Sequence, residues 1–346
     1  MTGQIATLCS LSPGIIKHSV LGQNFACLPQ LLRQAGYRTL FYYDIASSFS
    51  ASSRSSMEWL GFDEFQARLK NYDPGLKPRF GWSMEGDAVY YKDVFQHLKK
   101  NIIRKEPLFV VIANSENHFP YDQSEGMLAL MLQKKRWPQL FRNSQGNAVK
   151  ALQTFFNELK KSEWKDALVV ILGDHSTPML EHGNVMRDQG FYEENYRTFF
   201  ALSGLGPRHL SMAASQIDIA PTILDAIGLA VPNHFTGQSL LSKEAGNRPV
   251  FLTQYGDGGY YIIIQYPFKY VYRLSDGREY MFDLVLDPEE KNPRTSGNEV
   301  LTNEFRLMKK FFLLNQAVIL QNRQQPPQKN LENSNANRNR DYGGSL

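Results

Sequence analysis

The chain of 346 residues is short of cysteine, of net charge and of long apolar runs. Its two cysteines, Cys9 and Cys27, cannot build a disulfide-rich scaffold or an all-cysteine zinc site. The 38 Lys and Arg exceed the 34 Asp and Glu by only four, and no dense basic stripe is present, so nucleic acid is not an expected partner. No run reaches the roughly 18–20 apolar residues of a membrane span, and the first residues, MTGQIATLCSLSPG, lack the basic start and apolar core of a signal peptide.

Common phosphate-binding and nucleophile motifs are missing as well. The sequence holds no GxGxxG after a strand, no GxxxxGK[ST] phosphate loop and no GxSxG nucleophile elbow. Dinucleotide-binding, P-loop and α/β-hydrolase chemistry are therefore not expected. The aromatic-rich strands near 255–272 favour core and hairpin packing over a base-stacking platform.

The chain does contain an alternation of amphipathic and continuously apolar segments. Amphipathic spacing predicts helices, and short apolar runs are typical of parallel strands covered on both faces. The expected helices span 28–37, 84–103, 146–161 and 216–228, and the expected strands span 38–44, 107–114, 167–175 and 198–204. This alternation predicts an α/β fold with a doubly wound open sheet, right-handed crossovers and helices on both faces.

The pattern changes after about residue 247. Short apolar segments separated by Gly, Pro or Asp-Gly turns predict a small antiparallel sheet, and a final helix is expected over 302–320. From Gln321 onward the chain is Asn/Gln-rich, which is typical of a disordered tail. The expected organisation is an α/β core over 1–246, a β subdomain with a helix over 247–320 and a polar tail over 321–346.

Chemistry-bearing side chains follow two of the expected strands. Asp174 and His175 come directly after LVVIL, and open α/β sheets bind ligands beyond the carboxyl ends of their strands. The pair offers a hard oxygen and an imidazole nitrogen to a divalent metal. The alternative is structural: Asp174 would cap the next turn, and His175 would pack beside it. His118 follows the strand over 107–114, and His182 lies a short step beyond His175. Together these residues indicate a metal-assisted site for a phosphate or sulfate ester.

Arg54 lies in the Ser-rich segment 47–56, which is expected to be a loop. Its guanidinium could clamp an anionic substrate as a fork donor. By residue type alone, a solvated loop arginine is the commoner case.

Five motifs follow one another along the chain in an order that is typical of one protein family. They are NHFPY, GDHSTPMLEHGN, YRTFFALSGLG, QIDIAPTILDAIGL and FKYVYRLSDGREYMFDLVLDPEEKN. This order resembles the sulfatase-like branch of the alkaline phosphatase superfamily, over about residues 6–290. Within that branch, NHFPY and ATLCS look most like lipoteichoic acid synthases and the phosphoglycerol or phosphoethanolamine transferases.

The resemblance implies roles for individual residues. Asp174 and His175 would be ligands of a divalent metal (Mn, Mg, Zn or Ca), and His118 would contact the substrate phosphate. His182, in or beside the metal shell, and Arg54 would help to bind the substrate.

These enzymes use a threonine nucleophile. Aligning IATLCSLSP with the helix that follows the nucleophile places the nucleophile just before Met1, and Thr2 would serve only if this register slips by two residues. The chain therefore resembles a family member without its first strand, its nucleophile region and its membrane anchor.

The expected function is metal-dependent transfer or hydrolysis of phosphate esters on a phospholipid head group or another anionic ester. The full-length protein would be associated with a membrane and extracytoplasmic, in the periplasm or on the outer face of the inner membrane. A sulfatase is the alternative within enzymes, although TGQIATLCS lacks the Arg of the Cys/Ser-x-Pro-x-Arg motif. A catalytically inactive fragment or a binding pseudo-enzyme is the alternative outside them.

The residues alone leave open whether Cys9 and Cys27 are two buried thiols or one disulfide bridge. The extracytoplasmic setting that the resemblance implies permits a bridge, and we expect one.

Overall fold

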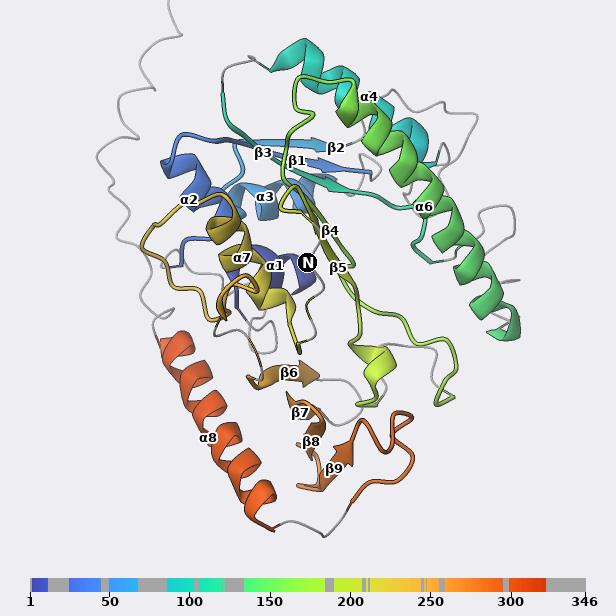
Figure 1. Ribbon diagram of the computed structural model, residues 1–346, viewed down its shortest axis with the longest axis vertical. Helices are drawn as coiled ribbons and strands as arrows, with labels where there is room; N and C mark the ends of the chain where they lie inside the picture. The colour runs from blue at the N-terminus through green and yellow to red at the C-terminus, as the bar shows by residue number, and fades with distance from the viewer. Residues whose placement is uncertain are drawn as a thin grey trace, which may run out of the picture.

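The computed structural model describes most of the chain (Figure 1). The described residues are 2–11, 25–44, 50–67, 86–102, 106–119, 121, 134–183, 190–206, 210, 212–243, 246, 248–254, 259–294 and 299–321. Most of the tail expected from Gln321 onward therefore lies outside the described residues. Among these residues, no helix is long and apolar enough to cross a membrane.

The centre of the core is a parallel sheet of three strands in the order β2-β1-β3. The strands are β1 Arg38–Tyr43, β2 Glu64–Ala67 and β3 Leu108–Ala113. Leu40 pairs with Glu64 in β2 and with Val110 in β3, so β1 is hydrogen-bonded along both edges. Four of its six residues are buried, as expected for a central strand.

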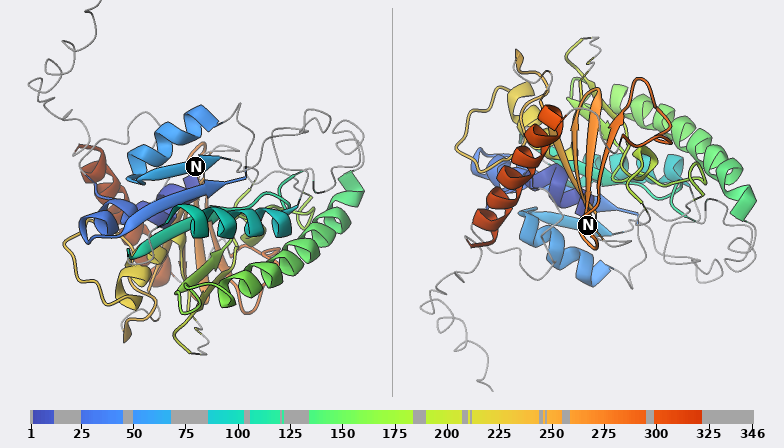
Figure 2. Two further views of the ribbon diagram at one scale, coloured as in Figure 1. Left: turned by 90° about the horizontal axis from the view of Figure 1, so that it is seen from above. Right: turned by 90° about the horizontal axis from the view of Figure 1, so that it is seen from below.

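Helices cover both faces of this sheet, because alternate side chains of each strand point to opposite sides. On one face, Phe41 packs among α1 Thr2–Cys9, α2 Leu28–Gln34, α3 Ser50–Leu60 and α7 Ile219–Ala226. On the other face, Leu40 and Tyr42 pack among α4 Asp87–Asn101 and α6 Trp137–Lys160. Figures 1 and 2 show the sheet between these two groups of helices, which confirms the α/β arrangement predicted from the sequence.

Two further strands of the core form an antiparallel pair, β4 Val169–Leu172 and β5 Phe200–Ser203. Val170 and Leu172 pack against the same apolar cluster as Phe41, so β4 belongs to the core. In the described part of the chain, β3 pairs only with β1, and β4 only with β5. Every residue of β3 and β4 is consequently half-buried, although both runs are as apolar as β1.

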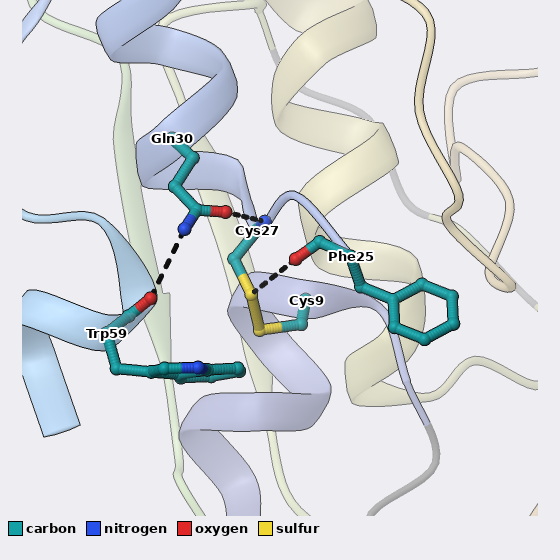
Figure 3. The surroundings of a disulfide bond; sticks show 5 residues. All are labelled: Cys9, Phe25, Cys27, Gln30 and Trp59. Atoms are coloured by element: carbon teal, nitrogen blue, oxygen red, sulfur yellow. Dashed lines mark hydrogen bonds between the residues drawn. A yellow bond between two sulfur atoms is a disulfide. The ribbon is translucent and has the colours of Figure 1, made fainter. Parts of the chain in front are cut away.

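Helix α1 is held at its carboxyl end by a disulfide and by a buried serine. Cys9 is bonded to Cys27 at the start of α2, with an S–S distance of 2.04 Å (Figure 3). Ser10 is fully buried: its Oγ donates to the carbonyl oxygen of Ile217 at 2.6 Å and accepts from the N–H of Gly237 at 2.8 Å. The bridge expected from the sequence is thus present, and it joins α1 to α2.

The segment after residue 247 folds into a four-stranded antiparallel sheet with one helix, as predicted. The elements are β6 Val250–Gln254, β7 Tyr260–Gln265, β8 Phe268–Arg273, β9 Glu279–Asp283 and α8 Glu299–Gln321. One face of the sheet packs on α8 through Phe305, and the other packs on Phe191 and Tyr196 of the core. Figure 1 shows this sheet at the opposite end of the molecule from α4.

The prediction of a loop over the Ser-rich segment was wrong where the structure describes it. Residues from Ser50 onward form α3, and its Met57 and Leu60 are buried against the core. Serine has a weak helix propensity, but burial of an apolar face outweighs such preferences.

Candidate functional site

The candidate site lies at the carboxyl end of β4, where Gly173, Asp174 and His175 follow the strand. The Asp174 side chain is 73% exposed, and its Oδ2 lies 3.6 Å from Nε2 of His175. Nδ1 of His175 lies 2.9 Å from the carbonyl oxygen of Ser176, which only accepts hydrogen bonds. Nδ1 therefore donates to this carbonyl oxygen, and Nε2 faces the exposed carboxylate of Asp174. Such backbone anchoring of one ring nitrogen is typical of metal-binding histidines.

The first turn of α1 lies directly against this strand end. A Cβ atom on Gly3 would stand 2.2 Å from the carbonyl oxygen of Asp174, so only glycine allows the approach. Nε2 of Gln216, in the 3-10 turn η7 Gln216–Asp218, donates to the carbonyl oxygens of Gly173 at 3.0 Å and Asp174 at 2.7 Å. Sequence reasoning missed Gly3 and Gln216, because these contacts join segments more than 40 residues apart.

A second loop, which carries His118, follows β3. Nδ1 of the His118 ring lies 2.7 Å from the carbonyl oxygen of Phe119. The backbone N–H of His118 donates to the carbonyl oxygen of Ser115 at 2.9 Å. The ring of Phe119 contacts the rings of Tyr121 and Trp137, and Tyr121 contacts Phe141. This aromatic packing fixes the His118 loop on the first turns of α6.

Buried acidic groups hold the beginning of the same loop. Asp87, fully buried at the start of α4, accepts from the N–H groups of Ser115 and Glu116 and from the Asn114 side chain at 2.6–3.2 Å. Glu116 in turn accepts from the N–H of Asp87 at 2.9 Å. Oγ of Ser115 also donates to Asp44, at the end of β1, at 2.5 Å. The ends of β1 and β3 and the start of α4 are thus tied into one network.

Two tyrosines bring these strand ends to the Asp174 loop. Burial raises the pKa of Tyr121 above its ordinary value, and the side-chain hydrogen bond with Thr177 lowers it by a smaller amount. Burial chiefly raises the pKa of Tyr43, at the end of β1, and the nearby charge of Asp174 adds to the rise. The hydrogen bond between Tyr121 and Thr177 therefore joins the loops after β3 and β4, and Tyr43 at the end of β1 lies within range of the charge of Asp174.

The other residues predicted for the site lie elsewhere or lack a described side chain. Thr2 is the first residue of α1, but its side chain is outside the described part. Arg54 is exposed on α3, with its guanidinium 5.4 Å from the centre of the Phe65 ring. His182 is bound to Glu194 and to the backbone of Glu289. Within the described residues, no group of three or more His, Cys, Asp or Glu side chains is placed to hold a metal, so Asp174 and His175 supply two ligands at most.

Comparison with known proteins shows the family to which the chain belongs. A family model described as Sulfatase matches residues 4–229. The Delta 4,5-hexuronate-2-O-sulfatase of Bacteroides thetaiotaomicron is 27% identical over 145 residues, which are 37% of this chain and 30% of that protein. Lipoteichoic acid synthase 2 of Bacillus subtilis is 23% identical over 267 residues, 72% of this chain and 40% of that protein. The chain thus spans less than half the length of these curated relatives.

Among solved structures, the lipoteichoic acid synthase LtaP from Listeria monocytogenes superposes with a TM-score of 0.68 at 19% identity. The match covers 93% of this chain and 80% of that one, and it shows the shared fold. The family model covers well over half of the chain, including both loops of the candidate site. The chain belongs to the sulfatase family.

Proposed function

We propose that this site transfers or hydrolyses phosphate esters of the phosphoglycerol or phosphoethanolamine type, with a divalent metal, on extracytoplasmic lipid or glycan substrates. The observation that carries the proposal is the meeting of the two loops that follow β3 and β4. The exposed Asp174–His175 pair follows β4, the His118 loop follows β3, and the Tyr121–Thr177 contact joins them. The similarity to two lipoteichoic acid synthases supports a phosphate ester as the substrate class.

Asp174 and His175 would hold Mn²⁺, Mg²⁺, Zn²⁺ or Ca²⁺ together with ligands outside the described pair. When bound, such an ion supplies Lewis-acid polarisation of the ester and lowers the pKa of a hydroxyl nucleophile. His118 would donate a proton or hydrogen bond to the leaving oxygen. Arg54 is proposed as an additional contact to the anion.

The start of α1 bears on the nucleophile. Its first turn touches the backbone of Asp174, and the unpaired N–H groups of a helix N-terminus favour a phosphate group. A hydroxyl at or just before this turn would therefore lie beside both the metal ligands and the phosphate. Thr2 is the candidate within this chain, and a residue before Met1 in a longer protein is the other.

The disulfide supports the proposed compartment. Structural disulfides persist in oxidising surroundings such as the periplasm or the cell exterior and are rare in the cytosol. The Cys9–Cys27 bond is buried within α1 and α2 and fits a protein that folds outside the cytoplasm.

Metal titration tests the site. Isothermal calorimetry with Mn²⁺ should show binding to the wild-type chain. The Asp174→Ala variant should lose more affinity than the roughly 10–100-fold that an outer hydrogen-bond partner contributes. Asp166→Ala is the matched control, because Asp166 is exposed at the opposite end of β4. Equal affinity of the Asp174 variant and the wild type would contradict the site.

Turnover of chromogenic esters tests the reaction. We expect faster hydrolysis of bis(p-nitrophenyl) phosphate than of p-nitrophenyl sulfate by the metal-loaded protein. The reverse preference would favour a sulfatase, which the Bacteroides relative supports. Metal binding without turnover of either ester would favour an inactive fragment or a binding pseudo-enzyme.

A further inference from the structure

His182 lies in the irregular segment that follows β4, and it contacts the C-terminal part of the molecule. Its Nδ1 lies 2.7 Å from Oε1 of Glu194, and its Nε2 lies 2.7 Å from the backbone carbonyl oxygen of Glu289, which follows β9. Its ring stacks on Tyr192 with the planes 1° apart and the centroids 3.7 Å apart. Every polar atom of the side chain is therefore engaged.

Both partners of the ring are hydrogen-bond acceptors, so both nitrogens donate, as only the protonated imidazole can. Burial by itself lowers the pKa of His182, but the hydrogen bonds with Glu194 and Glu289 and the charge of Glu290 raise it above its ordinary value. A ring that donates from both nitrogens has no lone pair to offer a metal. The arrangement therefore suits an anchor rather than a ligand.

The acceptor Glu194 lies on a short 3-10 helix, η6 Glu193–Asn195, that a buried ion cluster fastens to the C-terminal sheet. Lys269 of β8 is fully buried, with Nζ 3.0 Å from Oε1 of Glu193 and 2.6 Å from Oε1 of Glu290. Glu290 also accepts from the N–H of Glu193 at 2.6 Å. Breaking a buried ion pair of this kind leaves an uncompensated charge, so the partners of His182 are firmly placed.

The segment from Gly173 to His182 contains no helix or strand, so contacts with other parts of the molecule hold it in place. Gln216 binds the carbonyl oxygens at its beginning, and Tyr121 contacts Thr177 near its middle. His182 restrains it further along the chain. Partners that orient metal ligands from outside typically change metal affinity when they are removed.

We propose that His182 is a positioning residue that fastens the Asp174–His175 loop to the C-terminal sheet, so that this sheet forms part of the frame of the metal site. The proposal rests on the proposed function for the metal, whereas the anchoring itself does not depend on it. The sheet after residue 247 would thus help to keep the Asp174–His175 loop in place, through the imidazole of His182 and the buried Lys269 ion cluster.

Hydrogen–deuterium exchange on the full chain tests the anchoring directly. In His182→Ala, the amides of residues 176–183 should exchange about 10-fold faster, while the strands β6–β9 keep their protection. Glu194→Gln should shift the same amides by a smaller factor, because a neutral amide replaces the carboxylate. Lys291→Ala is the control, since its exposed side chain pairs with the carboxylate of Glu289 at the surface.

Calorimetry with Mn²⁺ alone tests the consequence for the site. We expect His182→Ala to weaken Mn²⁺ binding about 10-fold with little change in the thermal midpoint, and Lys291→Ala to bind as the wild type does.

Unchanged exchange in residues 176–183 would overturn the anchor, and so would exchange that rises equally throughout the C-terminal sheet. A faster-exchanging loop with unchanged Mn²⁺ affinity would overturn the role in the metal site. A wild type that binds no Mn²⁺ would contradict the proposed function, while the exchange data would still decide the anchor.

Discussion

Strands β1 and β4 both carry apolar runs of the core but have very different surroundings. RTLFYY of β1 has four fully buried residues, whereas all four residues of VVIL in β4 are half-buried. The difference follows from pairing: β1 has hydrogen-bonded neighbours on both edges, and β4 has one within the described residues. An apolar run thus indicates that a strand can be buried, whereas the number of neighbouring strands decides what fraction of its surface is buried.

The same contrast separates the well-packed core from the part of the molecule that carries the candidate site. Around β1 the two faces are closed by helices, and the disulfide joins two of them. At the end of β4 stands the exposed Asp174, in an irregular loop held at a few points. Reactive groups on loops that a rigid scaffold positions are the usual arrangement in enzymes.

The largest expected effect comes from truncating matched leucines of the two strands. Leu40→Ala in β1 should lower the free energy of unfolding by about 2–5 kcal/mol, because Leu40 has no exposed surface and its removal leaves a cavity. Leu172→Ala in β4 should lower the free energy of unfolding by about 1 kcal/mol, because the half-buried Leu172 side chain buries less apolar surface than Leu40 does. Urea unfolding followed by circular dichroism measures both values. Equal losses would show that β4 is as well packed as β1 in solution.

The disulfide should contribute a smaller amount on the closed side. Replacing Cys9 and Cys27 together by alanine removes a link across 18 positions and should cost about 3 kcal/mol. The wild type should lose a similar amount in reducing buffer, whereas the double variant should not respond to reductant. Two free thiols in non-reducing mass spectrometry of exported protein would contradict the bridge.

The smallest effect is a pH dependence in the well-packed C-terminal sheet. Hydrogen bonds from Arg306 chiefly, and from Tyr270, hold the pKa of Glu279 below its ordinary value of 4.5. A lowered pKa means that the carboxylate stabilises the folded state above about pH 4.5 and loses this contribution as the pH falls through the folded value.

Glu279→Gln should therefore be less stable than the wild type at pH 7, and the difference should shrink between pH 5 and pH 3. Thermal unfolding across this range measures it. Glu304→Gln, at an exposed position of α8, is the matched control and should leave the profile unchanged. A constant difference between the Glu279 variant and the wild type at all pH values would show that the Glu279–Arg306 pair does not cause the loss of stability in acid.

Much of the fold was predictable because its signals are local. Continuous apolar runs and amphipathic spacing indicated β1, β3, β4 and the helices α2, α4 and α6, and the Asp-Gly turn indicated the hairpin between β8 and β9. The Ser-rich segment was misjudged because its helix depends on Met57 and Leu60 packing against the core rather than on propensity. The antiparallel pairing of β4 with β5 was likewise not visible in the apolar pattern.

For the candidate site, the sequence placed His118, Asp174 and His175 after strands, and the structure shows them there. It could not show that Gly3 and Gln216 touch the backbone of Asp174, or that Tyr121 joins the two loops. Those contacts link residues far apart along the chain, and one sequence carries no record of such distances. The metal, nucleophile and substrate roles of these residues stay predictions.

The amino-acid sequence by itself determined which segments form the α/β core, which loops carry imidazole and carboxylate groups, and which two sulfurs were available to pair. Only the tertiary structure decided that β4 stays half-buried, that α1 begins on the backbone of Asp174, and that His182 donates to Glu194 and Glu289. The reason is physical: hydrophobic periodicity is set residue by residue, whereas burial and hydrogen-bond partners depend on which distant segments the fold brings together.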